Sequence, residues 1–361
     1  MQKIEFCGII IQTYGGGFMY QCRYSFWDDR QFPNFKNHLN TLERESKKYY
    51  KNHVPDGISQ QELNNGSELI QTFLSDYEFY LLALLRLGIA TNDNFSTIFE
   101  SLKKLSLIKV LPPDFRKYYG LTVNHKISIN SHIPPKGDLN DSSMKQLIIS
   151  HELGHIINEA WIQDAKQFAR ELYQMPRVKS ILQNMGLDSS YYLECGFSFI
   201  DEVVAEEVAE RVSYYSMQRE RPPMEYRQDK AIFNYQPYLT NYAFYGEFQE
   251  SAISFARSLH FLRCRKDQSS DAVMKRLVIH SFDKNFIRDM KQEILSSPDK
   301  LDDFIIMLAC MGKMKDATYQ ILGLSANQTS LDVRGYADSL RMISEKYVAD
   351  DGECIYQKKK S

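Results

Sequence analysis

The feature that most constrains this chain is a five-residue segment, His151-Glu152-Leu153-Gly154-His155, inside a stretch with helical periodicity. Histidines four residues apart lie on one face of a helix, one turn apart, so their ring nitrogens can converge on one metal ion. Glu152 lies next to the first histidine, where its carboxylate can take a proton from a water at the metal. Chance gives roughly 0.02 such segments in a chain of this composition. The segment predicts one zinc ion per chain, held by a helix that supplies two ligands and a general base.

The residues that flank this segment are apolar. Leu147, Ile148 and Ile149 precede it, and Ile156 and Ile157 follow it. A helix that is apolar almost all round is expected to be buried. Two imidazoles and a carboxylate are costly in such a helix unless a metal or a polar network meets them. We therefore favour a zinc site over the alternative of a core helix that holds no metal.

A catalytic zinc site needs a third protein ligand and an open fourth position. The acidic segment 201–207 follows in a predicted helix, and its Glu202 and Glu206 are one turn apart. Glu202 is the predicted third ligand, and Glu206 is predicted to accept a hydrogen bond from a ligand histidine. Glu206, Glu194 and His260 remain open as alternative third ligands. Without the upstream histidines, the same acids would indicate only a solvated row on a helix.

This pair of motifs resembles that of the gluzincin zinc metallopeptidases, of which thermolysin is the familiar representative. In that group H-E-x-x-H is followed by a helix with (N/D)-E-x-x-(S/T/A)-(D/E), and residues 201–206 here read Asp-Glu-Val-Val-Ala-Glu. The resemblance covers about residues 120 to 212, and bacterial metallopeptidases and injected effector or toxin proteases share the motif pair. It implies the following roles: His151, His155 and Glu202 as zinc ligands, Glu152 as general base, Glu206 as orienting carboxylate, and Asp201 in the place of the group's Asn or Asp.

A hydrolase of this kind also needs a proton donor that stabilises the transition state opposite the base. Tyr238, Tyr242, Tyr245 and His260 follow the predicted ligand helix, and each is a candidate. With 23 tyrosines in the chain, most tyrosines are expected to be packing residues. The other histidines are expected to be structural or exposed: His38, His53, His125, His132 and His280.

The predicted fold class is α+β and predominantly helical, with a small β-sheet beside a zincin-type active-site helix and with helical flanks. Three regions are expected: an N-terminal region (1–118) with a β-hairpin and a helical layer, a zincin-like catalytic domain (119–265) and a C-terminal helical region (266–361). The predicted elements are a hairpin over 4–26, helices within 37–109, one strand over 121–129, helices over 141–161, 164–185, 197–217 and 238–262, and further helices to 347 with breaks at 296–298 and Gly323.

The strand predicted over 121–129 alternates apolar and polar residues, and His125 falls on its apolar face. In the gluzincins a strand in this position borders the cleft and pairs with an extended substrate. An unpaired edge can pair with a peptide through main-chain hydrogen bonds. The alternative role is that of an ordinary strand within the sheet.

Composition excludes several other classes of protein. The chain has 44 Lys+Arg and 46 Asp+Glu, and its formal net charge of −2 argues against nucleic-acid binding. No apolar window approaches the roughly 20 residues of a membrane span, and no cleavable signal peptide is visible. The six cysteines contain no C-x-x-C, which argues against a thiolate zinc knuckle. We expect a cytoplasmic protein or one exported without a cleavable signal, such as a secreted effector.

These features together predict a zinc metallopeptidase that acts on a peptide or protein substrate. Glu152 would take the proton of a zinc-activated water and pass it to the leaving amine. The alternative is a non-catalytic or regulatory zinc-binding protein that binds a partner through its helical flanks, residues 39–110 and 266–361. An open metal site favours the enzyme, whereas a closed site with four protein ligands favours the alternative.

Overall fold

The structure is a computed structural model that describes residues 34–53, 60–111, 119–131, 141–218, 243–321 and 333–347. This part of the chain is predominantly helical with one small sheet, which confirms the predicted α+β class. Its elements in chain order are α1 (Phe35–Asn52), α2 (Gln60–Arg86), α3 (Phe95–Leu102), β1 (Leu107–Leu111), β2 (Gly120–Val123), β3 (Lys126–Asn130), α4 (Asp141–Gln174), α5 (Pro176–Asn184), α6 (Tyr191–Ser216), α8 (Ala243–Ser258), the 3-10 helix η1 (His260–Leu262), α9 (Ser270–Ser281), α10 (Phe286–Ile294), α11 (Pro298–Ile321) and α12 (Val333–Ser344).

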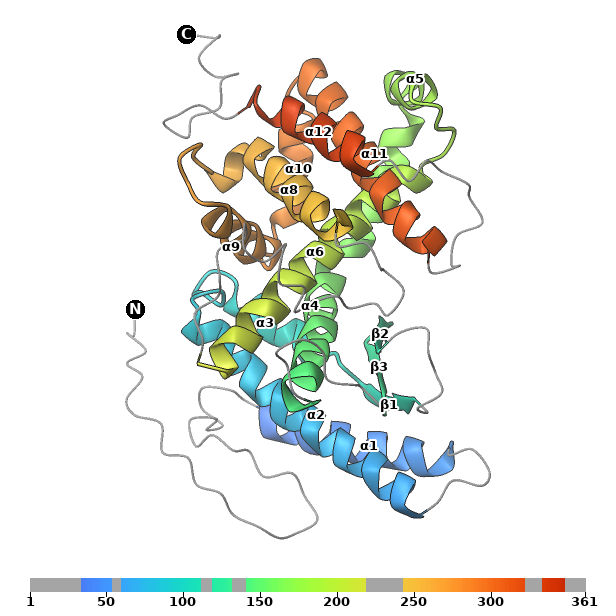
Figure 1. Ribbon diagram of the computed structural model, residues 1–361, viewed down its shortest axis with the longest axis vertical. Helices are drawn as coiled ribbons and strands as arrows, with labels where there is room; N and C mark the ends of the chain where they lie inside the picture. Colours follow the sequence, from blue (N-terminus) through green and yellow to red (C-terminus); the bar gives the residue numbers. More distant parts are fainter. Residues whose placement is uncertain are drawn as a thin grey trace.

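Two long helices, α4 and α6, cross at the centre of the molecule (Figure 1). Gly154 lies at this crossing, and a Cβ atom added to it would lie only 2.9 Å from the Cα atom of Ala205. A residue without a side chain therefore lets the two backbones approach closely at the segment 151–155. Helix α11 packs along the other side of α6, and α8 and α12 pack against each other beside it.

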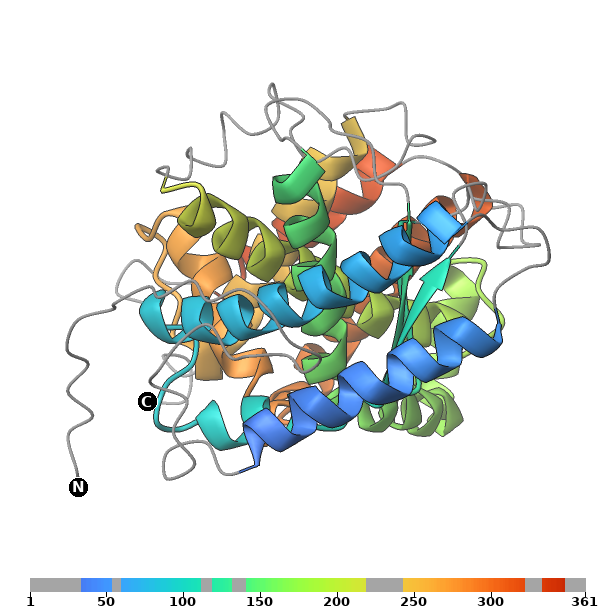
Figure 2. The same ribbon diagram turned by 90° about the horizontal axis from the view of Figure 1, so that it is seen from below.

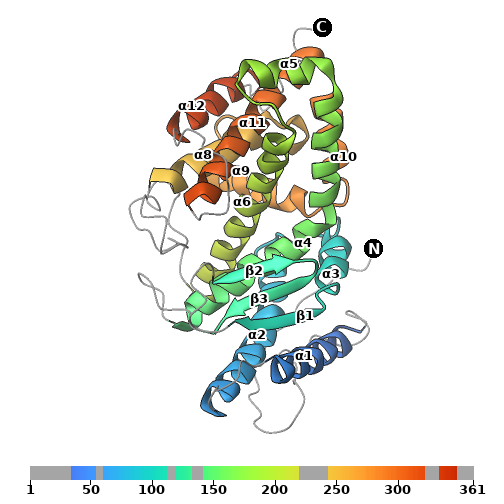
Figure 3. The same ribbon diagram turned by 90° about the vertical axis from the view of Figure 1, so that its right-hand side faces the viewer.

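The sheet has the strand order β1-β3-β2, with β1 parallel and β2 antiparallel to β3. Figure 3 shows it beside α4, with β2 nearest to that helix and β1 towards α1. Seen from below in Figure 2, α1 and α2 lie across the lower end of the molecule. These two helices pack against each other and against β1, and α2 also packs against α4.

The single strand predicted over 121–129 is wrong, because β2 and β3 form a hairpin. Asn124 and His125 form its two-residue turn, and both have positive φ angles, 50° and 56°, as in a type I′ turn. His125 is therefore a turn residue and not part of an apolar strand face. Its backbone N–H donates to Glu159 on α4, and its ring contacts the same carboxylate.

Two other element predictions also need correction. Residues 107–109, predicted as the end of the helical region, belong to β1, which pairs with β3. The helices predicted over 141–161 and 164–185 are instead one helix, α4, followed by α5, because neither glycine nor proline lies between His155 and Pro176, which starts α5.

The other boundaries shift or fall outside the described residues. Helix α6 starts earlier than predicted, and α8 with η1 covers the described part of the helix predicted over 238–262. The break at 296–298 is confirmed, since α10 ends at Ile294 and α11 begins at Pro298. The predicted hairpin over 4–26 and Gly323 lie outside the described residues.

One hydrophobic core runs through the described residues and includes side chains from all three regions expected from the sequence. Large aromatic side chains such as Tyr77, Phe197 and Phe304 are fully buried in it. Among the described helices, none combines the length and the apolar character needed to cross a membrane.

Candidate metal centre

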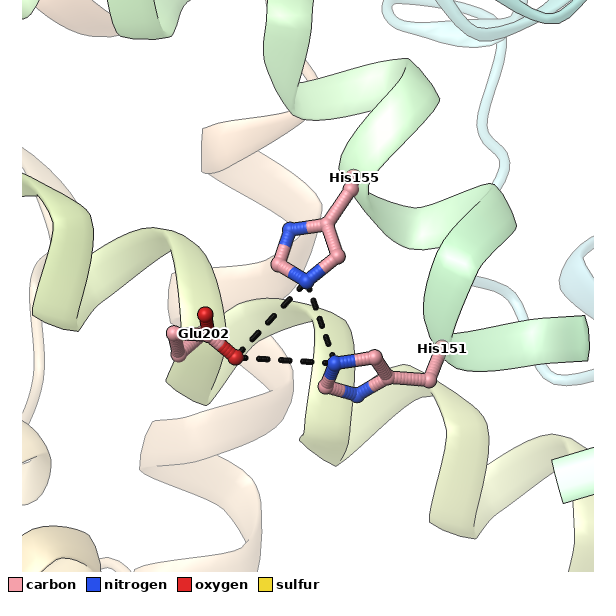
Figure 4. A group of neighbouring side chains, drawn as sticks. All are labelled: His151, His155 and Glu202. Atoms are coloured by element: carbon pink, nitrogen blue, oxygen red, sulfur yellow. Dashed lines mark hydrogen bonds and ion pairs between the residues drawn. The ribbon is translucent and has the colours of Figure 1, made fainter. Parts of the chain in front are cut away.

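Two helices bring together three side chains that could hold a metal ion (Figure 4). His151 and His155 come from successive turns of α4, and Glu202 comes from α6 where the two helices cross. The Nε2 atoms of the two histidines are 3.0 Å apart. The Oε2 atom of Glu202 lies 3.5 Å from His151 Nε2 and 3.7 Å from His155 Nε2.

These separations fit the size of a zinc ion. A point equidistant from the three atoms lies about 2.0 Å from each of them, and zinc binds histidine nitrogen and carboxylate oxygen at about 2.0 to 2.2 Å. An ion at or slightly above this point would reach all three atoms without a rotamer change. The Glu202 side chain is 41% exposed, whereas each of the two histidine side chains is 14% exposed.

The other ring nitrogen of each histidine lies next to a second carboxylate. His155 Nδ1 is 2.9 Å from Asp201 Oδ1, and His151 Nδ1 is 3.2 Å from Glu206 Oε2. With each ring proton on Nδ1, next to the neighbouring carboxylate, both Nε2 atoms are acceptors. Two acceptor nitrogens 3.0 Å apart repel each other unless a cation lies between them. The arrangement therefore suits a bound cation.

Asp201 is itself held in place by hydrogen bonds. Asn158 Nδ2 donates to its Oδ1 atom at 2.8 Å and to its backbone carbonyl at 3.2 Å. Trp161 Nε1 in turn donates to Asn158 Oδ1 at 3.3 Å. This chain of contacts links α4 to α6 and fixes the orientation of the His155 ring.

Glu152 is buried, with 4% of its surface exposed, and strand β2 positions its carboxylate. Thr122 Oγ1 donates to Glu152 Oε2 at 2.6 Å and lies 3.1 Å from the Glu152 backbone carbonyl. At Gly120, an added Cβ would overlap the same carboxylate, so only glycine leaves room for it. Burial raises the pKa of Glu152, and His151, His155 and Thr122 offset only part of this increase.

Lys315 on α11 also reaches the candidate site, and the sequence motifs did not indicate it. Its Nζ atom lies 2.8 Å from Glu202 Oε1, the carboxylate oxygen that does not face the histidines. Burial alone would raise the pKa of Glu202, but Lys315 and the two histidines hold it well below its usual range. The helix also contains Lys300 and Lys313 together with several acidic residues, and no motif distinguishes Lys315 from the other two lysines.

The acidic neighbours also set the electrostatics of the histidines. Burial would lower the pKa of His155, but Asp201 and Glu202 outweigh burial and raise it. Burial opposes protonation of His151 as well, yet Glu202 and Glu206 hold its pKa well above its usual range. The negative electrostatic potential of these carboxylates attracts cations, whether protons or a metal ion.

The remaining candidates from the sequence lie elsewhere or outside the described residues. Glu194 forms an ion pair with Arg170, with 3.0 Å between the charged atoms. His260 lies in η1, which packs against α8, α9 and α10. Tyr245 belongs to α8, and Tyr238 and Tyr242 fall outside the described residues. The transition-state stabiliser therefore stays a prediction.

No protein-family model matches this chain, and neither a curated protein nor a solved structure matches it. The side chains themselves define the class of site. They form a three-residue group of two imidazoles and one carboxylate, with a buried acid next to the first histidine.

Proposed function

We propose that this chain is a zinc-dependent metallopeptidase in which Glu152 is the general base. The observation that carries the proposal is the convergence of His151 Nε2, His155 Nε2 and Glu202 Oε2 on one point beside this buried carboxylate. Two histidines and a glutamate are typical ligands of catalytic zinc. The ligand set also agrees with the roles implied by the resemblance to gluzincins.

The number of ligands and their exposure favour an enzyme over a zinc-stabilised binding protein. Structural zinc sites are closed by four protein ligands, whereas catalytic sites keep one position open. Within the part of the chain that the structure describes, the group that could hold a metal has three members, and the side chain of Glu202 is partly exposed. Room for a water and a substrate is what a hydrolase requires.

A zinc ion at this site would polarise the substrate carbonyl and make the attacking water more acidic. Glu152 would then accept the proton of that water and deliver it to the leaving amine. Thr122 donates to Oε2 of Glu152 and so helps to hold the carboxylate in place. Asp201 and Glu206, next to the Nδ1 atoms, would keep the Nε2 atoms of the two histidines turned towards a bound cation.

The position of β2 supports a peptide as the substrate. This strand is at the edge of the described sheet, and its Thr122 contacts the proposed base. In this strand Leu121 and Val123 alternate with Thr122, the residue that contacts Glu152, and their side chains are 36% and 50% exposed. An extended peptide paired with the outer edge of β2 would pass close to the base.

The experiment that tests this proposal is a survey of new peptide termini in a cell lysate. The purified chain is stripped with a chelator, reloaded with Zn²⁺ and incubated with the lysate, and the new amino termini are then labelled and identified. The variants are Glu152→Gln and the matched control Glu159→Gln, which removes a carboxylate on the same helix that contacts His125.

We expect cut sites with the wild-type chain and with Glu159→Gln, but not with Glu152→Gln. Elemental analysis should find one zinc per chain in all three proteins, because Glu152 is not a ligand. Absence of new termini with the zinc-loaded wild type would contradict the peptidase, and cleavage by Glu152→Gln would reject Glu152 as the base.

A further inference from the structure

We infer that Lys315 is a positioning residue that keeps Glu202 a monodentate ligand, bound to the metal through one oxygen. The site would then stay four-coordinate and prefer Zn²⁺ to larger ions. This inference rests on the proposed zinc site, and it explains how the chain selects the coordination geometry of that site. It concerns a residue of α11, which belongs to neither of the two motifs.

The two oxygens of Glu202 have different partners. Oε1 lies 2.8 Å from Lys315 Nζ, whereas Oε2 lies 3.5 and 3.7 Å from the Nε2 atoms of His151 and His155. A carboxylate that binds a metal through both oxygens must turn both of them towards the ion. For Glu202 this rotation would break the contact with Lys315, a charge-assisted hydrogen bond.

The backbone around Lys315 is held rigidly against α6. Each helix has a glycine at their contact: a Cβ added to Gly196 would overlap the carbonyl of Leu308, and one added to Gly312 would overlap the carbonyl of Tyr192. Because neither backbone can move closer or rotate freely, Lys315, one turn after Gly312, has a fixed starting point for its side chain.

The Lys315 side chain is also confined. The residue is buried, and its Nζ atom lies 4.8 Å from the centre of the Tyr319 ring. A buried ammonium group is costly unless it is paired, and Glu202 supplies the opposite charge. The contact between Lys315 and Glu202 Oε1 is therefore costly to break, and Oε1 is kept from binding a metal.

The consequence concerns which ions fit the site. Zn²⁺ is satisfied by three protein ligands and one water in a tetrahedral arrangement. Mn²⁺ suits oxygen-rich sites of higher coordination number, and a Glu202 bound through both oxygens would supply one more ligand. The contact with Lys315 withholds that oxygen and so disfavours Mn²⁺ relative to Zn²⁺.

The test uses Co²⁺ as a spectroscopic substitute for zinc, because four-coordinate Co²⁺ absorbs visible light several times more strongly than five- or six-coordinate Co²⁺. The full chain is stripped with a chelator and titrated with Co²⁺, and Zn²⁺ and Mn²⁺ affinities are measured by competition with a chromophoric chelator. The variants are Lys315→Met, Lys315→Gln and Lys315→Arg, with Lys313→Met as the matched control. Lys313 is on the same helix, and its Nζ lies over the ring of Tyr192.

We expect strong absorption from the wild type, Lys313→Met and Lys315→Arg, which keeps a donor for Oε1. In Lys315→Met the absorption should fall several-fold, and the ratio of Zn²⁺ to Mn²⁺ affinity should fall by roughly tenfold, the lower end of effects seen for residues that orient ligands. Lys315→Gln, which is polar but shorter, should behave like Lys315→Met and replaces it should that variant fail to fold.

The outcomes separate this inference from the proposed function. A wild-type spectrum of four-coordinate Co²⁺ that both Lys315→Met and Lys315→Gln leave unchanged would overturn the role of Lys315 alone. A wild-type chain that binds neither Co²⁺ nor Zn²⁺ would contradict the metal centre itself.

Discussion

Loss of the contact between Asp201 and His155 should weaken zinc binding by a predictable amount. The two atoms are 2.9 Å apart, and a hydrogen bond to a charged group contributes about 1.5 to 3 kcal/mol. The Asp201 side chain is 19% exposed, so water would replace part of the lost interaction. We therefore expect the lower half of that range, about 1.5 to 2 kcal/mol, for Asp201→Ala, which is roughly a 10- to 30-fold weaker affinity.

The assay is competition for Zn²⁺ with a chromophoric chelator at neutral pH. Asp201→Asn keeps an acceptor for His155 but loses the charge, so it should lie between the wild type and Asp201→Ala. Glu194→Gln is the matched control, because it removes an acid on the same helix that pairs with Arg170. Wild-type affinity in Asp201→Ala, or an equal loss in Glu194→Gln, would refute the reasoning.

Three further changes have expected outcomes. Gly154→Ala should weaken zinc binding, because its new Cβ would lie 2.9 Å from Ala205 Cα and displace α6 together with its ligand; wild-type affinity in the same chelator assay would show that this close approach is unimportant. Thr122→Val should leave zinc content unchanged and reduce kcat at least tenfold, because the buried carboxylate of Glu152 loses a hydrogen bond of about 1.5 to 3 kcal/mol; an unchanged kcat for a cleaved peptide would argue against this role. Burial lowers the pKa of His38 to about 4, below the value of 6.5 expected in the unfolded chain. The unfolded state then binds the proton first, so the free energy of unfolding should fall by about 3 kcal/mol as the pH drops from about 6.5 to 4. Urea unfolding of His38→Gln should lack this part of the pH dependence, and an identical pH dependence in both proteins would contradict the assignment.

The local part of the candidate site could be predicted from the sequence because helical spacing determines it. His151 and His155 are four residues apart and therefore lie on one face of a helix. Asp201, Glu202 and Glu206 lie together on a later helix that is predicted from the same sequence. That these two helices cross at the required place depends on Gly154 and Ala205, whose contact is a property of the tertiary packing.

Lys315 and Thr122 could not be predicted, because each reaches the site from an element distant in sequence. Thr122 contacts Glu152 only because β2 packs against α4, and Lys315 reaches Glu202 only because α11 packs along α6. Neither residue type nor spacing distinguishes these two from other threonines and lysines of the chain.

The fold class was predictable from the sequence, but the strands that make up the small sheet were not. The alternation of apolar and polar residues continues from β2 through Asn124 and His125 into β3, so a period of two cannot reveal the turn. Residues 107–111 are a short apolar run, which fits a helix or a strand equally well, and their pairing with β3 decides the outcome.

The most direct measurement is anomalous diffraction at the zinc edge from crystals of the chelator-stripped and zinc-reloaded chain. We predict one peak per chain, about 2.0 to 2.2 Å from His151 Nε2, His155 Nε2 and Glu202 Oε2. A peak at any other group of side chains, or no peak between these three residues, would contradict the metal centre and the hydrolase built on it.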